Sequence, residues 1–252
     1  MRGHRVAAFL DYDGTLAPIA PRPELATLPA ATRHALAALA RACPVALISG
    51  RDRADVMRLV DLEGLFYVGS HGLDIEAPDG TAIHGDMARP FISDLAAATG
   101  ALRREAAAIA GVLIEEKAFA VAVHYRLVDT QDVPSVRAAV ERVAARFPRL
   151  RVTGGKKVLE LRPRVDWHKG TAVLALLDAL SPDARGLMPI YIGDDETDED
   201  AFAAIKGRGL GVLVSTAPAP ATRADYRLRD PGEVRQFIEA LTEMVRAAPG
   251  SE

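Results

Sequence analysis

Two acidic residues, Asp11 and Asp13, directly follow a short apolar run, Val6 to Leu10, near the start of the chain. Such a run predicts a buried parallel strand, and open α/β sheets bind ligands at the carboxyl ends of their strands. Residues two apart in a strand share a face, and Gly14 lets the backbone turn back over them. Two carboxylates about 4 Å apart repel by roughly 4 kcal/mol at an effective dielectric constant near 20. The pair therefore requires a cation, a shared proton or a functional reason, and a solvated acidic turn is the alternative.

A second acidic cluster, residues 194–200, follows another apolar run, Met188 to Ile192. Thr197 and Asp200 have the spacing of a capping box, which would account for the second half of the cluster. This box leaves Asp194 and Asp195 unexplained, and they would add charge to the same rim of the sheet as Asp11. Carboxylate oxygens of this kind suit Mg²⁺, so the two clusters together predict a magnesium site.

Two further features are expected at that rim. Lys169 lies in the first turn of a predicted helix, where the macrodipole disfavours a cation by roughly 0.3–1 kcal/mol. It would neutralise part of the carboxylate cluster and pair with a phosphate, unless it is a solvated lysine on an exposed face. Ser49, with the backbone N–H groups around Gly50, supplies neutral donors for a phosphate oxygen, although Ser-Gly alone is typical of a turn.

Together these groups predict phosphoryl transfer. One carboxylate would attack phosphorus to form an aspartyl-phosphate, and a second would protonate the leaving alcohol and later activate water. Mg²⁺ and the lysine would hold the charge. Because hydrolysis of phosphate monoesters is among the slowest uncatalysed reactions, such a site requires dense electrostatic preorganisation.

Alternating strands and helices surround these residues and predict an α/β fold with a doubly wound, parallel (Rossmann-like) core sheet. Strands are expected at 6–10, 44–48, 65–68, 188–192, 209–214 and 225–228. Helices are expected at 31–41, from a cap at Asp52, at 167–180, through Phe202 and at 233–245. Between the third and fourth of these strands, the predicted order of elements changes to helix, strand, strand, helix, strand, strand. We therefore expect core segments 1–88 and 163–252 with an inserted α+β domain at 89–162.

Composition restricts the class of protein. The chain has 252 residues, 49% of them apolar, and a net charge of −3 without a long basic run, so neither nucleic acid nor a membrane is an expected partner. Its single cysteine, Cys43, cannot form an internal disulfide and is expected to be a buried apolar residue. The first strand begins within a few residues and no apolar run could span a bilayer, so we expect a cytoplasmic protein.

The motifs resemble a known superfamily. The string Asp-Tyr-Asp-Gly-Thr-Leu from Asp11, then Ser49, Lys169, and Gly-Asp-Asp-Glu-Thr-Asp from Gly193 look like the four ordered motifs of haloacid dehalogenase-like phosphatases. The resemblance implies that Asp11 is the nucleophile and Asp13 the general acid and base. It also implies an inserted cap domain between the second and third motifs.

The same resemblance implies binding roles for the other motif residues. Ser49 and Lys169 would bind the phosphate, and Gly50 and Arg51 would contact the substrate. The implied Mg²⁺ ligands are Asp11, the Asp13 carbonyl and Asp194, with Asp195 or Asp198 acting directly or through water.

Two predicted strands of the insert, 119–126 and 156–162, each combine an apolar face with a face of mixed charge. The polar side chains on these faces are His124, Arg126, Lys156, Glu160 and Arg162. An outward solvated face is the default for a free two-layer domain. Over a rim that binds oxyanions, however, Lys, His, Glu and Arg suit the vicinal hydroxyls of a sugar phosphate.

The local strings at 69–73, 115–126 and 155–163 look like signatures of trehalose-6-phosphate phosphatases, in the core and in the insert. Ala118 departs from the pattern, which has glycine there. The resemblance implies that a small-molecule phosphosugar is the substrate and that a trehalose-6-phosphate synthase is a functional partner. The sugar contacts it implies are Lys117, His124, Lys156, Glu160 and Arg126, with His71 near the cleft; structural roles for the two histidines stay open.

Other functions remain open at this point. Sucrose 6-phosphate or a glycosyl-phosphoglycerate would use the same chemistry. A non-catalytic phosphosugar sensor that signals to a synthase would have no need of the nucleophile Asp11. A phospho-accepting receiver domain also uses acids, Thr and Lys, but such a chain has no role for an insert of about 70 residues.

Overall fold

The structure is a computed structural model that describes residues 5–20, 25–83, 89–155, 157–181, 186–216 and 221–248. It divides into two compact units, Met1–His84 with Trp167–Glu252, and Gly85–Asp166. The insert expected at 89–162 lies within the second unit. Because each unit has a sheet and a core of its own, the two are described separately.

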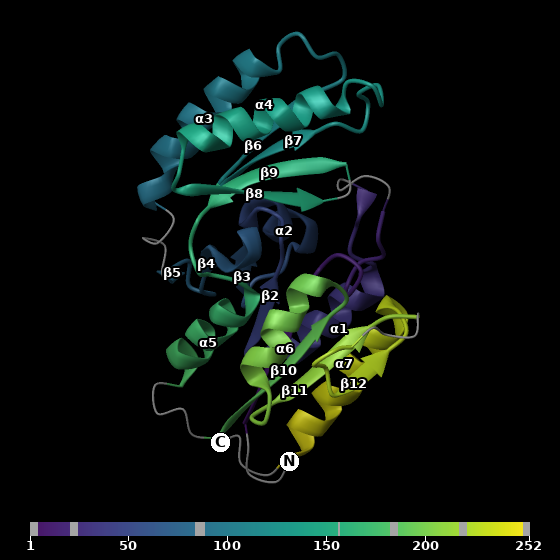
Figure 1. Cartoon of the computed structure of the whole chain (residues 1–252). Coiled ribbons are helices and arrows are strands. Elements are labelled where there is room, and N and C mark those ends of the chain that lie inside the picture. The colour runs from purple at the N-terminus through teal and green to yellow at the C-terminus, as the bar shows by residue number, and fades with distance from the viewer. Residues whose placement is uncertain are drawn as a thin grey trace. The chain divides into compact units, whose positions relative to one another are not determined.

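The larger unit is built on an eight-stranded sheet with the order β12-β11-β10-β1-β2-β3-β4-β5 (Figure 1). Its strands are β1 (Arg5–Leu10), β2 (Val45–Ile48), β3 (Phe66–Gly69), β4 (Asp74–Glu76), β5 (Ala82–Ile83), β10 (Leu187–Gly193), β11 (Leu210–Val214) and β12 (Tyr226–Leu228). The strands from β12 to β3 are parallel, whereas β4 and β5 pair antiparallel. The sequence did not predict these two strands, because two or three residues are too few to show a strand periodicity.

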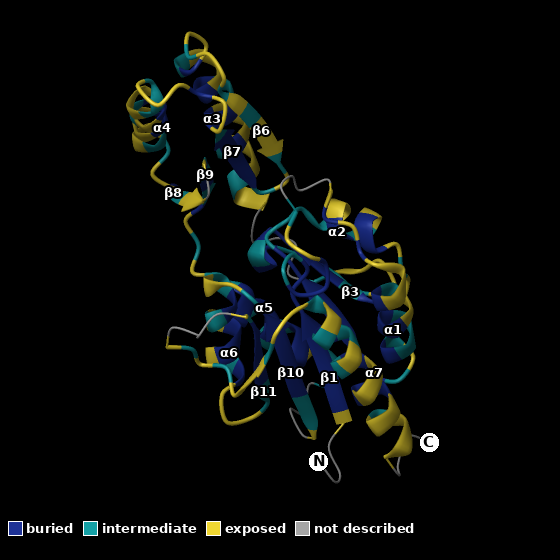
Figure 2. Ribbon diagram, turned by 90° about the vertical axis from the view of Figure 1, so that its right-hand side faces the viewer, coloured by how far each residue is buried: buried dark blue, intermediate teal, exposed yellow. Residues whose placement is uncertain are grey.

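Helices cover both faces of this sheet, which confirms the α/β class. They are α1 (Ala30–Ala40), α2 (Arg53–Val60), α5 (Lys169–Leu180), α6 (Glu199–Ile205) and α7 (Pro231–Ala247). In β1, Ala8 and Leu10 pack into a core with α1, α2 and α7, whereas Ala7 and Phe9 pack into a second core with α5 and α6. Both faces of β1 are therefore buried, which is why its sequence is a continuous apolar run (Figure 2).

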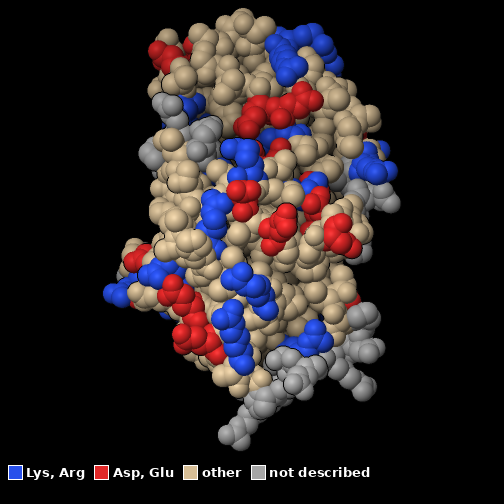
Figure 3. Space-filling model, turned by 180° about the vertical axis from the view of Figure 1, so that it is seen from behind, with Lys and Arg blue, Asp and Glu red and all other residues tan. Residues whose placement is uncertain are grey.

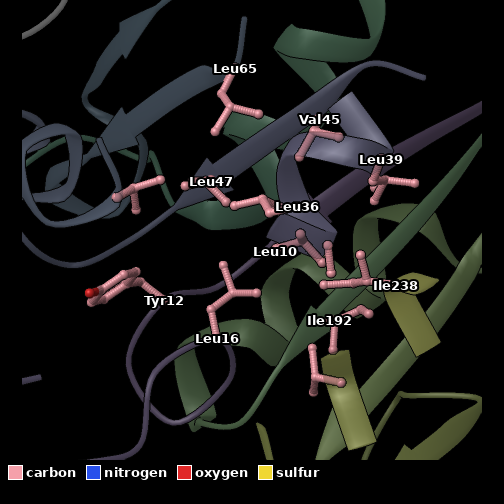
Figure 4. Packing of buried hydrophobic residues seen from close by; sticks show 14 of the residues in the cluster. Leu10, Tyr12, Leu16, Leu36, Leu39, Val45, Leu47, Leu65, Ile192 and Ile238 are labelled. Atoms are coloured by element: carbon pink, nitrogen blue, oxygen red, sulfur yellow. The ribbon is translucent and has the colours of Figure 1, made fainter. Parts of the chain in front are cut away.

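Figure 4 shows the first of these cores from close by, with Leu10, Leu47 and Ile192 from the strands next to Leu36 of α1 and Ile238 of α7. All five side chains are at most 1% exposed. Burial of a leucine or isoleucine side chain contributes about 1.5–3 kcal/mol to folding. This packing fixes the strand ends from which the functional residues project.

The order of the strands places a topological switch point between β1 and β10. From β1 the chain proceeds through α1 to β2 on one side, and from β10 it proceeds through α6 to β11 on the other. In such sheets a crevice opens at the carboxyl ends of the two strands where the direction reverses. Asp11 follows β1 and Asp194 follows β10, so both acidic clusters lie at this point.

The smaller unit contains a four-stranded antiparallel sheet with the order β6-β7-β9-β8. Its elements, in chain order, are α3 (Ile92–Glu105), β6 (Leu113–Lys117), β7 (Ala120–His124), α4 (Val133–Arg146), β8 (Leu150–Gly155) and β9 (Val158–Pro163). Val121 and Val123 of β7 pack with α3 and α4 in a separate apolar core. Side chains alternate along a strand, so Ala122 lies on the opposite face, in register with Glu160 of β9.

Acidic and basic side chains are interspersed on the face shown in Figure 3, in keeping with the small net charge of −3. Across the part of the chain that the structure describes, every helix is too short or too polar to cross a membrane.

Candidate active site

Asp11 follows β1 directly and its side chain is only 7% exposed. Lys169 Nζ donates a hydrogen bond to Asp11 Oδ1 at 2.8 Å. Burial raises the pKa of Asp11 well above its ordinary value; Asp198 and Asp194 add to the rise and Lys169 opposes it. A carboxylate in this setting is largely withdrawn from water and is paired with a cation, which are the conditions for a nucleophile or a metal ligand.

Asp13 has a different partner. The Arg51 guanidinium donates two hydrogen bonds to its carboxylate, from Nε to Oδ2 at 2.6 Å and from Nη2 to Oδ1 at 2.5 Å. The Arg51 guanidinium also lies 5.5 Å from the centroid of the Tyr12 ring. A two-pronged contact of this kind fixes the orientation of a carboxylate. Arg51 was expected to contact substrate, and in this structure its side chain holds Asp13.

The turn after these acids depends on Gly14, whose φ is +84°. A Cβ at this position would collide with the carboxylate of Asp194, so the close approach of two chain segments also demands glycine. Thr15, which is fully buried, donates from its hydroxyl to Asp194 Oδ1 at 3.3 Å. The turn therefore brings the second acidic cluster against the first.

Lys169 is the first residue of α5 and is 2% exposed. Its Nζ donates to Asp11 Oδ1 and to Asp198 Oδ1, each at 2.8 Å, which explains a cation at a helix N-terminus. Burial alone would lower the pKa of Lys169, but the charges of Asp11 and Asp198 outweigh it and the pKa is raised. An ammonium has three N–H groups, so one remains for a phosphate oxygen. The solvated-lysine alternative is therefore wrong.

The acidic loop differs from the capping box expected at Thr197 and Asp200. The N-cap is Asp195, which accepts from Thr197 N at 2.7 Å, and its box partner is Asp198. The predicted box was wrong by two residues because the loop's first helical turn starts earlier, as a short 3-10 turn at Glu196–Asp198. Burial would raise the pKa of Asp195, but Lys169 and the hydrogen bonds from Thr197 lower it.

Asp194 points back toward the first motif. Burial, then the charges of Asp198 and Asp195, raises its pKa from 3.8 to about 7. Asp11, Asp194 and Asp198 each offer a carboxylate oxygen, and these atoms lie within 4.8 Å of one another. Carboxylate oxygens are hard donors that fit a divalent cation such as Mg²⁺. Such a cation would also balance the charges that, after burial, raise the pKa values of Asp11 and Asp194.

Ser49 follows β2 and is 1% exposed. Its Oγ accepts a hydrogen bond from Arg51 N at 3.1 Å, which leaves its hydroxyl proton for an incoming oxygen.

The His71 ring lies against Gly50, where a Cβ would come within 2.6 Å of His71 Nε2. Ser70 and His71 have φ values of 51° and 56°, a conformation that costs non-glycine residues about 1 kcal/mol or more. This left-handed turn is held by backbone hydrogen bonds from His71 N to Ser49 O and from Ser70 N to Arg51 O.

Within the smaller unit, Glu160 is the centre of a polar cluster on the face of the sheet opposite the helices. Lys117 Nζ donates to its Oε1 at 2.7 Å and Arg162 Nε to its Oε2 at 2.8 Å. The side chains of these three residues are 14–21% exposed. His124 Nε2 and Glu115 Oε2 are 2.7 Å apart. The resemblance implies five sugar-binding residues in the insert. Three of them, Lys117, His124 and Glu160, contact polar partners in this sheet.

Arg126, a fourth insert residue, is not brought into this cluster. Arg126 lies beyond β7 in an exposed turn, because the strand predicted to continue to 126 ends at His124. Lys156 lies outside the described residues.

Sequence reasoning missed some contacts that shape these sites. The hydroxyls of Thr15 and Tyr191, and the side chain of Glu115, contact predicted site residues but were not singled out. Glu115 could have been found, because strand alternation places it on the same face as Lys117. The two hydroxyls follow no pattern in the sequence: the partner of Thr15 lies 179 residues away, and that of Tyr191 lies across the turn that follows β10.

A family model described as Trehalose-phosphatase matches residues 9–232, most of the chain. The chain belongs to the trehalose-phosphatase family. The matched range includes both acidic clusters, Lys169 and the whole of the smaller unit. The resemblance derived from the motifs is therefore confirmed, and the family is one of phosphatases.

Individual relatives agree with membership of the trehalose-phosphatase family. "Probable trehalose-phosphate phosphatase D" of Arabidopsis thaliana is 41% identical over 96% of this chain and 68% of its own length. A solved "trehalose-6-phosphate phosphatase related protein" is 25% identical with a TM-score of 0.79, covering 94% of this chain and 97% of that one. A haloacid dehalogenase-like hydrolase from Bacteroides thetaiotaomicron, 16% identical with a TM-score of 0.68 over 94% of this chain and 99% of its own, shares the fold.

This member of the trehalose-phosphatase family spans only part of its curated relatives. It covers about two thirds of the length of the phosphatases and 18% of the length of a Mycobacterium tuberculosis protein named as an uncharacterized glycosyl hydrolase. The similarity thus concerns this region of those proteins.

Proposed function

We propose that this chain hydrolyses trehalose 6-phosphate to trehalose and inorganic phosphate through an aspartyl-phosphate on Asp11. The observation that supports this most directly is the buried contact of Asp11 with Lys169, with the Asp194 carboxylate beside it. A buried carboxylate that is merely structural has no need of two further acids within 4.8 Å. A phosphoryl-transfer site does, because the acids hold the cation that balances the phosphate.

In the first half of the reaction, a carboxylate oxygen of Asp11 attacks phosphorus and the bond from phosphorus to the sugar oxygen breaks. Asp13 gives its proton to that leaving oxygen. In the second half, Asp13 takes a proton from water, the water oxygen attacks the same phosphorus, and the bond to Asp11 breaks, which releases phosphate. Lys169, Ser49 and the backbone around Gly50 stabilise the phosphoryl oxygens.

The proposed cofactor is Mg²⁺. Asp11 and Asp194, with the Asp13 carbonyl and Asp195 or Asp198 as further candidates, would hold it. When bound, it neutralises charge on the phosphoryl group.

Specificity is proposed to come from the smaller unit acting as a cap domain. Its Glu160, with the basic partners Lys117 and Arg162, forms a half-buried polar cluster on the sheet face opposite the helices. Paired carboxylate and ammonium groups offer both acceptors and donors to sugar hydroxyls. His124, Lys156 and Arg126, together with His71 of the larger unit, remain proposed contacts. A functional link to a synthase that makes the phosphosugar follows from this substrate.

The proposal is tested by phosphate release from a panel of substrates with Mg²⁺ and with EDTA. Trehalose 6-phosphate is expected to exceed sucrose 6-phosphate, a glycosyl-phosphoglycerate and glucose 6-phosphate, and EDTA is expected to abolish release. Equal turnover of glucose 6-phosphate would exclude the disaccharide assignment.

The mechanism is tested by Asp11→Asn, which is expected to bind substrate with little or no turnover. Asp61→Asn is the matched control, because the Asp61 side chain is 88% exposed and its left-handed backbone suits asparagine. Unchanged turnover in Asp11→Asn would reject the covalent mechanism and favour a phosphosugar-binding regulator.

A further inference from the structure

Tyr191 lies in β10 and is fully buried. Its hydroxyl donates a hydrogen bond to Asp198 Oδ1 at 2.6 Å, and its ring meets Phe202 edge to face with the centroids 5.6 Å apart. A buried strand tyrosine commonly finds a main-chain carbonyl, as Tyr67 of β3 does with Leu62 O at 2.6 Å. Tyr191 instead donates to a charged group of the site.

Asp198 is the hub of that site. Its Oδ1 accepts from Lys169 Nζ at 2.8 Å as well as from Tyr191, and its Oδ2 accepts from Asp194 N and Asp195 N, each at 3.0 Å. An ionised carboxylate has about four acceptor positions. Among the described residues these four donors occupy them all, so Asp198 is fully engaged by the protein.

Two of the groups that Asp198 holds belong to the chemistry. Lys169 also contacts Asp11. Asp194, whose main-chain N–H donates to Asp198, has one of the carboxylates that fit a cation. If one donor to a buried carboxylate is removed, the remaining donors must compensate, because an unsatisfied buried charge is costly. Lys169 is the only mobile donor of the other three, so it would be drawn toward Asp198 and away from Asp11.

We infer that Tyr191 is a positioning residue for the proposed phosphatase reaction, acting through Asp198 to keep Lys169 on Asp11. The inference rests on the proposed function for its reaction and on the four hydrogen bonds of Asp198 for its geometry. It also assigns Asp198 to the support of the site, which leaves Asp11 and Asp194 as the carboxylates that hold a cation. The role of Tyr191 does not follow from the motifs, since this residue lies outside them.

The test compares Tyr191→Phe with Tyr67→Phe, which removes the same atom from another buried tyrosine of the same sheet. With p-nitrophenyl phosphate as substrate, kcat of Tyr191→Phe is expected to fall by roughly 10- to 100-fold with an unchanged KM. Tyr67→Phe is expected to keep the parent kcat. Mn²⁺ affinity, measured by electron paramagnetic resonance, is expected to stay the same in both variants, because the proposed ligands are intact.

A fluorine signal reports on the lysine directly. Beryllium fluoride binds aspartate carboxylates as an analogue of a phosphoryl group, and its ¹⁹F resonances sense nearby N–H groups. They are expected to shift in Tyr191→Phe and not in Tyr67→Phe, because Lys169 moves relative to Asp11.

Equal kcat values for the two variants would overturn the inference, as would a loss of Mn²⁺ affinity in Tyr191→Phe that matches its loss of kcat. Failure of the parent protein to prefer trehalose 6-phosphate would overturn the proposed substrate and leave this inference standing, since the rates are measured with a substrate that has no sugar.

Discussion

The raised pKa of Asp194 predicts that the protein without metal becomes less stable as the pH rises. In the unfolded chain this carboxyl ionises near 3.8, and in the folded chain near 7. Between those values the folded chain binds the extra proton, so this contribution to stability is complete below pH 3.8 and is lost as the pH rises through 7. Added Mg²⁺ would replace the proton as the partner of the carboxylate and reverse the loss.

The magnitude follows from the two pKa values. Their difference corresponds to about 4 kcal/mol of unfolding free energy. The side chain is only partly buried, so solvent screening reduces this, and part of the loss occurs below pH 5. In EDTA, we expect the unfolding free energy of the parent protein to fall by about 1–2 kcal/mol relative to that of Asp194→Asn between pH 5 and pH 8.

The assay is urea unfolding followed by the fluorescence of Trp167, the single tryptophan of the chain, which lies in the larger unit. The quantity that matters is the difference in unfolding free energy between the parent protein and Asp194→Asn, because the titrating groups remote from Asp194 cancel in it. Asp61→Asn controls for a change of charge at an exposed site. A difference that stays constant from pH 5 to pH 8 in EDTA, or that Mg²⁺ leaves unaltered at pH 8, would refute the reasoning.

Three further substitutions test the site. Gly14→Ala is expected to cost about 1–2 kcal/mol for its left-handed backbone, and to lower turnover because its Cβ would displace Asp194; thermal unfolding and phosphate release measure both effects. Arg51→Gln is expected to slow hydrolysis of a sugar phosphate more than of p-nitrophenyl phosphate, whose leaving group needs no proton from Asp13, whereas an equal loss on both substrates would contradict a positioning role. Glu160→Gln is expected to raise KM for trehalose 6-phosphate by roughly 10-fold and to leave p-nitrophenyl phosphate hydrolysis unchanged; a matched loss on both would show that the cluster is structural.

Much of the fold was accessible from periodicity. The continuous apolar run at Val6 to Leu10 marks a strand buried on both faces, and the structure has β1 there. The helical spacing of Val173, Leu176 and Leu177 likewise located α5. Such patterns are local, because the apolar residues along one face of a helix or strand show that this face is buried. The short strands β4 and β5 carry no such pattern and were missed.

The sequence by itself determined which residues could do the chemistry, because Asp11, Asp13, Lys169 and Asp194 stand directly after strands or at a helix start, where the topology of the sheet must gather them. Only the tertiary structure decided how they are paired. Arg51 holds Asp13, Asp195 rather than Thr197 caps the acidic loop, and Asp198 is surrounded by four donors. Whether a hydrogen bond forms depends on donor and acceptor positions to within a few tenths of an ångström, and the spacing of residues along a sequence does not determine positions so finely.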